Sequence, residues 1–148
     1  MDKAYVTINN VLVNLINEIW ELEEKAIITE EFKDLTNNDM HVIEAIGTGE
    51  PKNMSTIARL LSVTVGTLTI AMNSLVKKGY VIRQRGTMDR REVYISLSEK
   101  GREAFEHHAR FHHAMIDGVS KELSQDEMEL LIKTLTKLNR WFRSWQDY

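Results

Sequence analysis

The sequence predicts a mainly α-helical chain that carries one small β-hairpin. Apolar stripes at helical spacing lie at opposite ends of the chain, and between them two runs of alternating polarity flank a polar turn. The third observation is charge. Residues 52–102 hold ten Lys and Arg against three acidic residues, a net charge of +7, whereas the rest of the chain carries −10. Residues 52–102 are therefore expected to bind a polyanionic partner, and the acidic segments on either side of them are not.

Length and composition narrow the class further. A chain of 148 residues with 43% hydrophobic and 28% charged residues suits one domain, or a small domain with helices that pair it with a second copy. It holds no long apolar run and its N-terminus lacks the pattern of a signal peptide, so we expect a cytoplasmic protein without a membrane partner. The absence of cysteine excludes thiol chemistry. Nothing in the spacing of carboxylates or glycines indicates an enzyme.

Both ends of the chain are predicted to be long helices. Each has a narrow apolar seam, and the second follows a capping box from Ser124 to Glu127. Seams of this kind favour an intertwined homodimer, with packing inside one monomer as the alternative. The seam residues are Ile8, Leu12, Leu15, Ile19, Leu22 and Ala26 near the N-terminus, and Met128, Leu131, Leu135, Leu138, Phe142 and Trp145 near the C-terminus.

Shorter elements fill the middle. "LTNNDMHVIEAIG" has a cap at Thr36 and a glycine stop at Gly47, which predicts a helix. "GTGEPKN" is expected to be a loop, and "MSTIARLLS" and "VGTLTIAMNSLVKKG" are expected to be two helices joined by a short turn. "YVIRQR" and "EVYISL" alternate around "GTMDRR" as a hairpin, and a long helix begins after the cap Ser98.

A helix, a short turn, a second helix and a basic hairpin form the layout of a winged helix-turn-helix. We place this DNA-binding lobe at 34–102 and a helical dimerisation region at 1–33 and 103–148. On its second helix, Leu68, Ala71, Met72 and Leu75 share the buried face. Base-edge contacts are then expected from the outward residues, which are Thr64, Val65, Thr67, Ile70, Asn73, Ser74 and Lys77.

This outward face indicates an A·T-rich operator. Asn pairs with adenine, the apolar groups contact thymine methyls, and no guanine-reading Arg or Lys precedes Lys77. In the hairpin, Arg90 is expected to enter a narrow minor groove, and Asp89 to brace the turn through a bidentate pair with Arg91. The remaining basic side chains are predicted phosphate contacts: Arg59, Lys77, Lys78, Arg83 and Arg85.

The stretch "GTMDRREVYISLSEKG" resembles the wing signature of the MarR family of bacterial repressors. The matching positions are Asp89, Arg90, Arg91, Leu97, Ser98 and Gly101. The resemblance covers nearly the whole chain, including both terminal helices. It implies a MarR-like intertwined homodimer that binds double-stranded DNA at a palindrome, with one recognition helix in each half-site.

Three further stretches are similar to the fatty-acid-synthesis repressors of that family: "FKDLTNNDMHVIEAIG", "VTVGTLTIAMNSLVKKGYV" and "RFHHAM". This resemblance implies long-chain acyl groups on acyl carrier protein as corepressor and no other cofactor. Arg102 and Arg110 are candidate docking residues for that acidic carrier. Family architecture puts effector pockets where the terminal helices meet the DNA-binding lobe, although residues of these types also fit a plain core. The candidates are Phe32, Met40, His41, Val42, Ile43, Ile46, Phe105, His108, Phe111, His112 and Met115.

The histidines support an alternative. "HHARFHH" places His108 and His112 one helical turn apart, the spacing of a chelating pair, and His41 is a candidate third ligand. On this hypothesis the protein is a MarR-type regulator that senses zinc or another small ligand. Hydrogen bonds that couple the long helix to the helix of His41 are the other interpretation.

Overall fold

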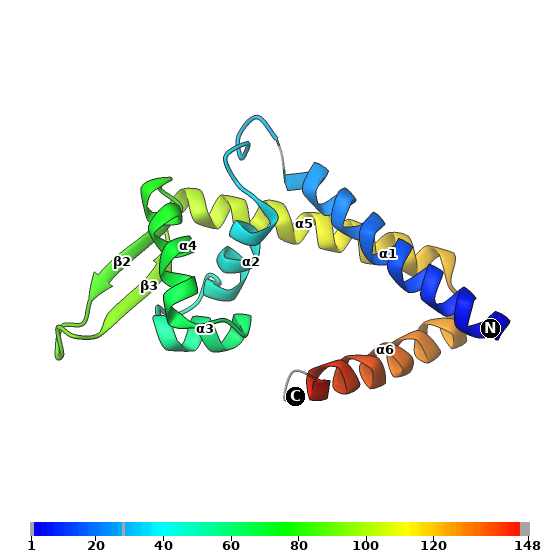
Figure 1. The fold of residues 1–148 in the computed structure, drawn as a ribbon. Coiled ribbons are helices and arrows are strands. Elements are labelled where there is room, and N and C mark those ends of the chain that lie inside the picture. Colours follow the sequence, from blue (N-terminus) through cyan, green and yellow to red (C-terminus); the bar gives the residue numbers. More distant parts are fainter. Residues whose placement is uncertain (1, 28, 146–148) are drawn as a thin grey trace. The chain divides into compact units, whose positions relative to one another are not determined.

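A computed structural model describes residues 2–27 and 29–145 (Figure 1). The chain divides into two compact units, residues 1–111 and residues 112–148, and helix α5 runs unbroken across the division. The elements in chain order are α1 (Lys3–Ile27), α2 (Asn37–Ile46), β1 (Lys52–Asn53), α3 (Met54–Leu61), α4 (Val65–Lys77), β2 (Val81–Arg85), β3 (Val93–Leu97), α5 (Glu99–Glu122) and α6 (Gln125–Trp145).

The predicted boundaries of α2 and α3 are confirmed, and local capping sets them. Before α2, the Asp39 amide donates to the Thr36 hydroxyl and the Thr36 amide donates to the Asp39 carboxylate, both at 3.1 Å. The helix ends at Gly47, whose φ of 68° favours glycine. Ser62, at a φ of 54°, ends α3 and turns the chain into α4.

The hairpin is confirmed, and a third strand joins it. Strands β2 and β3 pair antiparallel from Val81 opposite Leu97 to Arg85 opposite Val93. We expected a loop at "GTGEPKN", and this was wrong for Lys52 and Asn53, which form β1 on the other edge of β3. A strand of two residues is too short to show alternation, and the open edge of β3 supplies its hydrogen-bonding partner.

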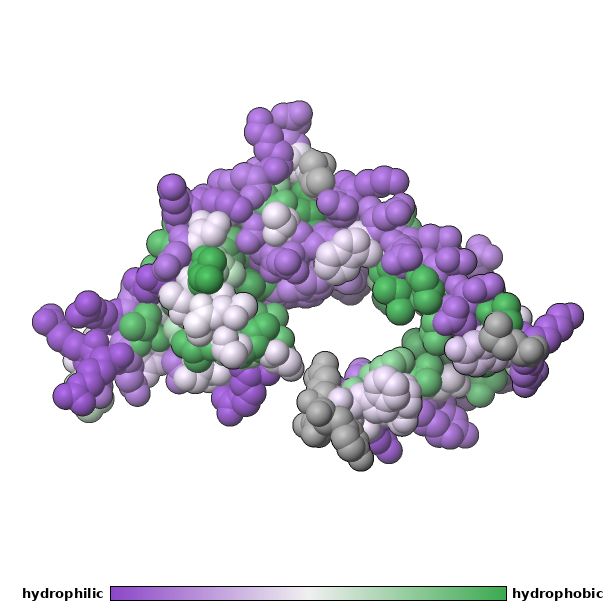
Figure 2. Space-filling view, in the orientation of Figure 1, coloured by the Kyte–Doolittle hydropathy of each residue, from purple (hydrophilic) through white to green (hydrophobic). Residues whose placement is uncertain are grey.

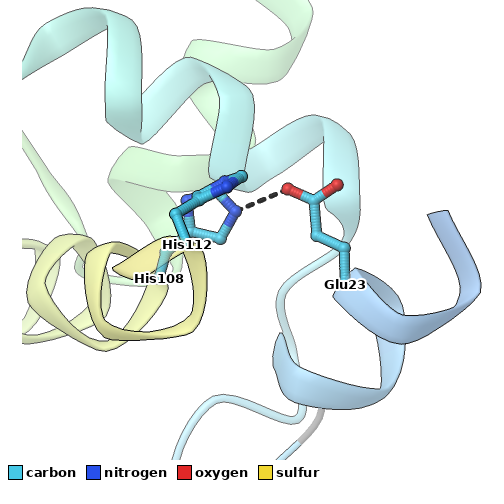
Figure 3. Close-up of side chains that lie close together, drawn as sticks. All are labelled: Glu23, His108 and His112. Carbon is cyan, nitrogen blue, oxygen red and sulfur yellow. Dashed lines mark hydrogen bonds and ion pairs between the residues drawn. The ribbon is translucent and has the colours of Figure 1, made fainter. Parts of the chain in front are cut away.

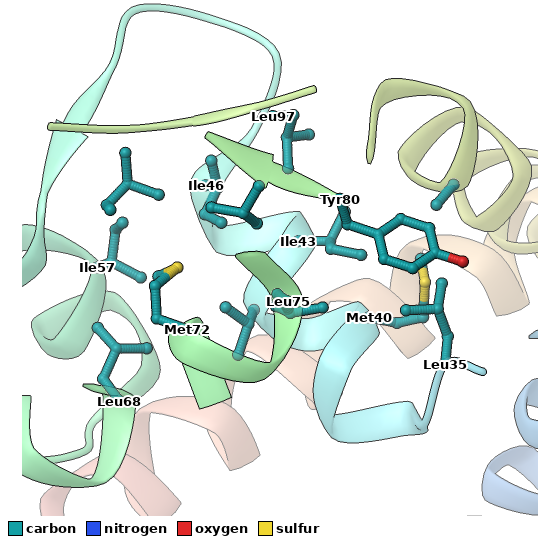
Figure 4. Close-up of a cluster of buried hydrophobic side chains, with 14 of the residues drawn as sticks. Leu35, Met40, Ile43, Ile46, Ile57, Leu68, Met72, Leu75, Tyr80 and Leu97 are labelled. Carbon is teal, nitrogen blue, oxygen red and sulfur yellow. The ribbon is translucent and has the colours of Figure 1, made fainter. Parts of the chain in front are cut away.

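The core lies in the first unit, where α2, α3 and α4 pack against the sheet (Figure 4). Met72 from α4, Ile43 from α2 and Ile57 from α3 are fully buried there. Tyr80, just before β2, and Ile95 on β3 close the same cluster. The core thus joins α4 to the sheet that carries the hairpin.

The terminal helices leave their seams exposed or half-buried in the single chain. On α1, which begins at Lys3 and so before the predicted stripe, Ile8 is 59% exposed and Leu22 is 55% exposed. On α6 no described residue is buried, and Leu135 and Trp145 are more than half exposed. Figure 2 shows hydrophobic residues at the surface over each of these helices. Apolar surface of this extent is typical of an interface.

Among the described residues no single helix is long and apolar enough to cross a membrane; α3 and α4 meet those criteria only when taken together, and they are bent by 106° relative to each other.

Candidate nucleic-acid interface

Helix α4 presents the outward face that the sequence predicts. Leu68, Met72 and Leu75 are buried, whereas Val65 is 45% exposed and Ile70 is 75% exposed. The other predicted base contacts are exposed as well, except for Ser74, which is half-buried. The packing of α4 therefore leaves a polar and apolar face, without charge before Lys77, available to a partner.

The start of α4 is fixed by its threonines. The Thr67 amide donates to the Thr64 hydroxyl at 3.1 Å, so Thr64 is the N-cap. The Thr64 hydroxyl in turn donates to the Thr67 hydroxyl at 2.9 Å. Both residues remain exposed, and the bonds between them hold the first turn of the helix in one conformation.

The wing is closed by bonds within its turn. The Gly86 amide donates to the Glu92 carbonyl at 2.8 Å, and the Glu92 amide donates to the Asp89 carbonyl at 3.2 Å. A Cβ at Gly86 would lie 2.5 Å from the Asp89 carbonyl oxygen, so the turn requires glycine there. Arg90 and Met88 are exposed at the tip.

The expected bidentate pair between the Asp89 carboxylate and the Arg91 guanidinium is wrong, because a different group of Arg91 is the donor. Asp89 Oδ1 accepts from the backbone amide of Arg91 at 2.9 Å, and not from its guanidinium. The carboxylate follows the common local pattern in which an aspartate bonds its own backbone two residues on. Asp89 therefore braces the turn as predicted, and the Arg91 side chain extends from it.

The basic side chains fall into two groups. The first group is exposed and makes no hydrogen bond or ion pair to another described element: it comprises Lys77, Arg85, Arg90 and Arg59, which donates to the Thr56 hydroxyl at 3.4 Å within its own helix. The second group bonds to a neighbouring element. Lys78 instead pairs with Asp39 on α2 at 2.9 Å. Arg83 donates from Nη2 to Oδ1 of Asn73 at 2.6 Å, so the wing and α4 are bonded directly. Figure 2 shows the resulting hydrophilic surface over the wing.

A polar cluster anchors the base of the wing. The Tyr80 hydroxyl donates to Asp34 Oδ1 at 2.6 Å, and Lys100 Nζ lies 4.3 Å from the centroid of the Tyr80 ring. Burial, followed by the hydrogen bond to Asp34, raises the pKa of Tyr80 above its ordinary value. The same hydrogen bond lowers the pKa of Asp34, with a smaller contribution from the charge of Lys100. The cluster therefore favours a protonated tyrosine and an ionised aspartate.

A second polar cluster joins α1, α2 and α5. His108 is 1% exposed, and its Nε2 lies 2.6 Å from Glu23 Oε1 (Figure 3). Glu44 lies 3.5 Å from Nδ1 of His108 and 3.9 Å from Nδ1 of His41. The coupling of His41 to the long helix that the sequence suggested is thus made through Glu44.

Neither carboxylate of this cluster, Glu23 or Glu44, is predicted from the sequence. The run "ELEEK" around Glu23 looks like a solvated helical face, yet Glu23 is 6% exposed. A signal was available, because Glu23 stands four residues from both Ile19 and Ile27 and so shares their side of α1. His112 follows His108 by one turn on the continuous helix α5.

The predicted ligand residues are placed in different settings. Phe32, Met40, Ile43 and Ile46 belong to the buried core. Phe105 packs against that core, and Phe111, His112 and Met115 are half-buried along α5. His41 lines two hollows of the DNA-binding lobe, one of about 590 Å³ with Leu60 and one of about 540 Å³ beside Thr67 and Ala71 of α4. Val42 also lines the second hollow.

Comparison with known proteins places this geometry among transcriptional regulators. Residues 23–108 match the family model described as transcriptional regulator SarA/Rot. The transcriptional regulator PchR of Bacillus subtilis is 31% identical over 115 residues, which cover 72% of this chain and 63% of PchR. SarZ of Staphylococcus saprophyticus is 40% identical over 70 residues, which cover 47% of this chain and 48% of SarZ. The chain thus spans less than two thirds of the length of these curated relatives.

Solved structures agree with the fold. Streptococcus pneumoniae FabT in complex with DNA has a TM-score of 0.90 and 35% identity, covering 95% of this chain and 98% of FabT. A mutant of Escherichia coli MarR in complex with operator DNA has a TM-score of 0.70 and 22% identity, covering 91% of this chain and 95% of that one, and shows the fold alone.

Proposed function

Because the chain belongs to the MarR-type winged-helix transcriptional regulators, a DNA-binding family that is not enzymatic, we propose that it represses transcription by binding an A·T-rich palindrome as a homodimer. The observation that carries the proposal is the exposed face of α4 beside the basic wing. One α4 enters the major groove of each half-site, and Arg90 enters the flanking minor groove.

The homodimer is supported by the exposed seams of α1 and α6. In each helix, half of the predicted seam residues are exposed to solvent in the single chain, and the others are half-buried. Pairing with a second copy removes this surface from water and makes a two-fold arrangement of recognition helices. A palindromic operator follows from that symmetry.

Site selection tests the operator. Randomised duplexes bound by the protein are expected to yield A·T-rich half-sites, because the outward residues of α4 offer an amide and apolar groups and no guanidinium. G·C-rich half-sites would overturn the proposed base preference. An affinity for DNA that does not change with salt concentration would overturn DNA recognition by the wing.

The regulated process is proposed from the likeness to FabT. That structure matches nearly the full length of this chain at 35% identity, and the histidine-containing stretches of the sequence resemble the same branch of the family. We infer that the chain controls fatty-acid-synthesis genes and that acyl carrier protein bearing long acyl chains strengthens operator binding. Arg102 and Arg110, both exposed on α5, are proposed contacts for the acidic carrier.

Titration of operator binding tests the corepressor. The long-chain acyl form of the carrier should tighten binding, and the carrier without an acyl chain should not. Arg110→Ala should weaken the response while leaving binding without carrier unchanged. Equal effects of the two carrier forms would contradict the role of the acyl chain.

A zinc-responsive regulator is the second candidate. The observation that favours it is the carboxylate of Glu23 at 2.6 Å from His108, with His112 one turn further along α5. Glu23, and not the predicted His41, is the third member of this set. A carboxylate and paired imidazoles are ligands that zinc accepts. Zinc and a chelator, added as separate arms of the same titration, decide between the candidates: a response to zinc alone would replace the acyl proposal.

A further inference from the structure

Arg83 of the wing and Asn73 of α4 form a hydrogen bond that is not predicted from the sequence. Arg83 Nη2 lies 2.6 Å from Asn73 Oδ1. The register explains the reach of the arginine: Arg83 stands opposite Ile95, so the two side chains share one face of the hairpin. Ile95 on that face is fully buried in the core. The Arg83 side chain therefore extends along the lobe toward α4.

The chemistry of this bond orients the asparagine. A guanidinium only donates hydrogen bonds, so the amide group of Asn73 must turn its oxygen to Arg83 and its NH2 group away. A donor that carries charge makes a stronger bond than a neutral one. The amide is thus held in one of its two flip states before any DNA is bound.

We propose that Arg83 is a positioning residue for base readout, which holds the Asn73 amide in the orientation that recognises adenine. The amide oxygen keeps a second lone pair, and the amide nitrogen keeps its protons. Adenine offers an N6–H donor beside the N7 acceptor, which matches that oxygen and that nitrogen. The inference rests on the proposed operator binding by α4 and adds the source of its specificity at one base pair.

Arg85 provides a matched control on the same strand. It stands opposite Val93 and shares the face of Arg83, two residues nearer the wing tip. Its charge is the same, and its predicted role is a phosphate contact. Substituting each arginine in turn therefore separates an effect on base choice from an effect of lost positive charge.

The experiment measures base preference at every half-site position. Operators varied one base pair at a time are bound by the wild type and by the Asn73→Ala, Arg83→Met and Arg85→Met variants, at two salt concentrations. The position read by Asn73 is the one where Asn73→Ala abolishes the preference for adenine. There Arg83→Met should reduce that preference from roughly tenfold to about twofold, since one bidentate contact discriminates by roughly 5- to 150-fold.

The Arg85→Met variant and a double variant serve as controls. Arg85→Met should weaken binding to all operators alike and lower the salt slope by about one. The double variant Asn73→Ala with Arg83→Met should show no loss of preference beyond that of Asn73→Ala. Unchanged circular dichroism and unfolding midpoints of each variant confirm that the lobe stays folded.

Two results overturn the inference. In one, Arg83→Met acts as Arg85→Met does, weakening all operators equally while the adenine preference survives. In the other, Asn73→Ala changes no adenine preference. Both are distinct from failure of the proposed function, in which the wild type itself selects no operator and the inference falls with it.

Discussion

The Tyr80 hydroxyl donates a 2.6 Å hydrogen bond to Asp34, which joins the start of the wing to the segment that leads into α2. Lys100 at the start of α5 reaches the same pair, with Nζ 4.0 Å from Asp34 Oδ2. Three segments far apart in the sequence thus meet at the base of the wing. Removing this bond should loosen the wing without touching the DNA-binding face.

Tyr80→Phe deletes the hydrogen bond and keeps the ring. We expect a loss of about 1 kcal/mol in the free energy of unfolding at pH 7, the usual contribution of one hydrogen bond, because the Asp34 side chain is 43% exposed and is rehydrated. Urea unfolding at fixed protein concentration measures it. Tyr94→Phe, which removes a hydroxyl bonded to Glu92 in the wing, is the control and should leave the midpoint unchanged.

The same pair predicts a pH dependence. The folded state lowers the pKa of Asp34 below 3.8, so the stabilisation by ionised Asp34 is complete above that value. It is lost as the pH falls through the lower pKa of the folded state. The difference between wild type and Tyr80→Phe should therefore shrink in acid. A difference that stays constant from neutral pH to strongly acidic pH would contradict this assignment.

Gly101 is predicted to be required for packing. A Cβ there would lie 2.1 Å from the Tyr80 carbonyl oxygen and 3.2 Å from Leu97 Cβ. Gly101→Ala should therefore destabilise the fold by about 1–3 kcal/mol, the usual cost of overpacking. In the same helix a Cβ at Gly118 meets no described atom within 4 Å, and Gly118→Ala should stabilise by roughly 0.5–1 kcal/mol. Thermal unfolding that shifts in the same direction for both variants would refute the packing argument.

The bond between Glu23 and His108 is predicted to stabilise the junction of α1 and α5. Glu23→Ala removes the carboxylate from a histidine that is 1% exposed, so we expect a loss of about 1–3 kcal/mol. Glu24→Ala, at the exposed neighbouring position, should change stability by less than about 0.5 kcal/mol. Both are measured by urea unfolding with a chelator present. Equal losses for the two variants would show that the buried bond contributes nothing.

Arg90→Ala tests the tip of the wing. Loss of its charge should reduce the salt slope of operator binding by about one, and the affinity should fall most where the flanking sequence is A·T-rich, because a narrow minor groove concentrates negative potential. Lys33→Ala removes an exposed positive charge outside the wing and helix-turn-helix and serves as control. Gel shifts at two salt concentrations give both quantities. An equal loss on A·T-rich and G·C-rich flanks would exclude insertion in the minor groove.

Leu135→Glu tests the seam of α6. The leucine is 53% exposed in the single chain, and in the proposed dimer a carboxylate at this position would be buried without a partner. We expect the dimer dissociation constant to rise at least roughly a hundredfold, which corresponds to about 2.7 kcal/mol. Sedimentation at several concentrations measures it. Lys137→Glu, at an exposed position nearby, should leave the dimer intact, and a dimer that tolerates both changes would place the interface elsewhere.

Local sequence rules account for most of the architecture. Thr36, Ser98 and Ser124 were predicted caps, and each makes its bond within three residues. Gly47 ends α2 as its position suggests. These features are predictable because a cap is completed inside one helical turn, whatever the rest of the chain does. The short strand β1 escaped prediction because its pairing depends on β3, more than forty residues away.

The residue pattern alone predicts the two terminal helices with their apolar seams, the order of helix, turn, helix and basic hairpin, and the resemblance to a family of regulators. The polar partners are seen only in the folded chain: Glu23 with His108, Asp34 with Tyr80, and Asn73 with Arg83. The two kinds of feature differ in the distance over which they act. Periodicity and capping act over about four residues. The partner of a polar side chain is chosen by the packing of distant elements, which brings one compatible group within hydrogen-bonding distance.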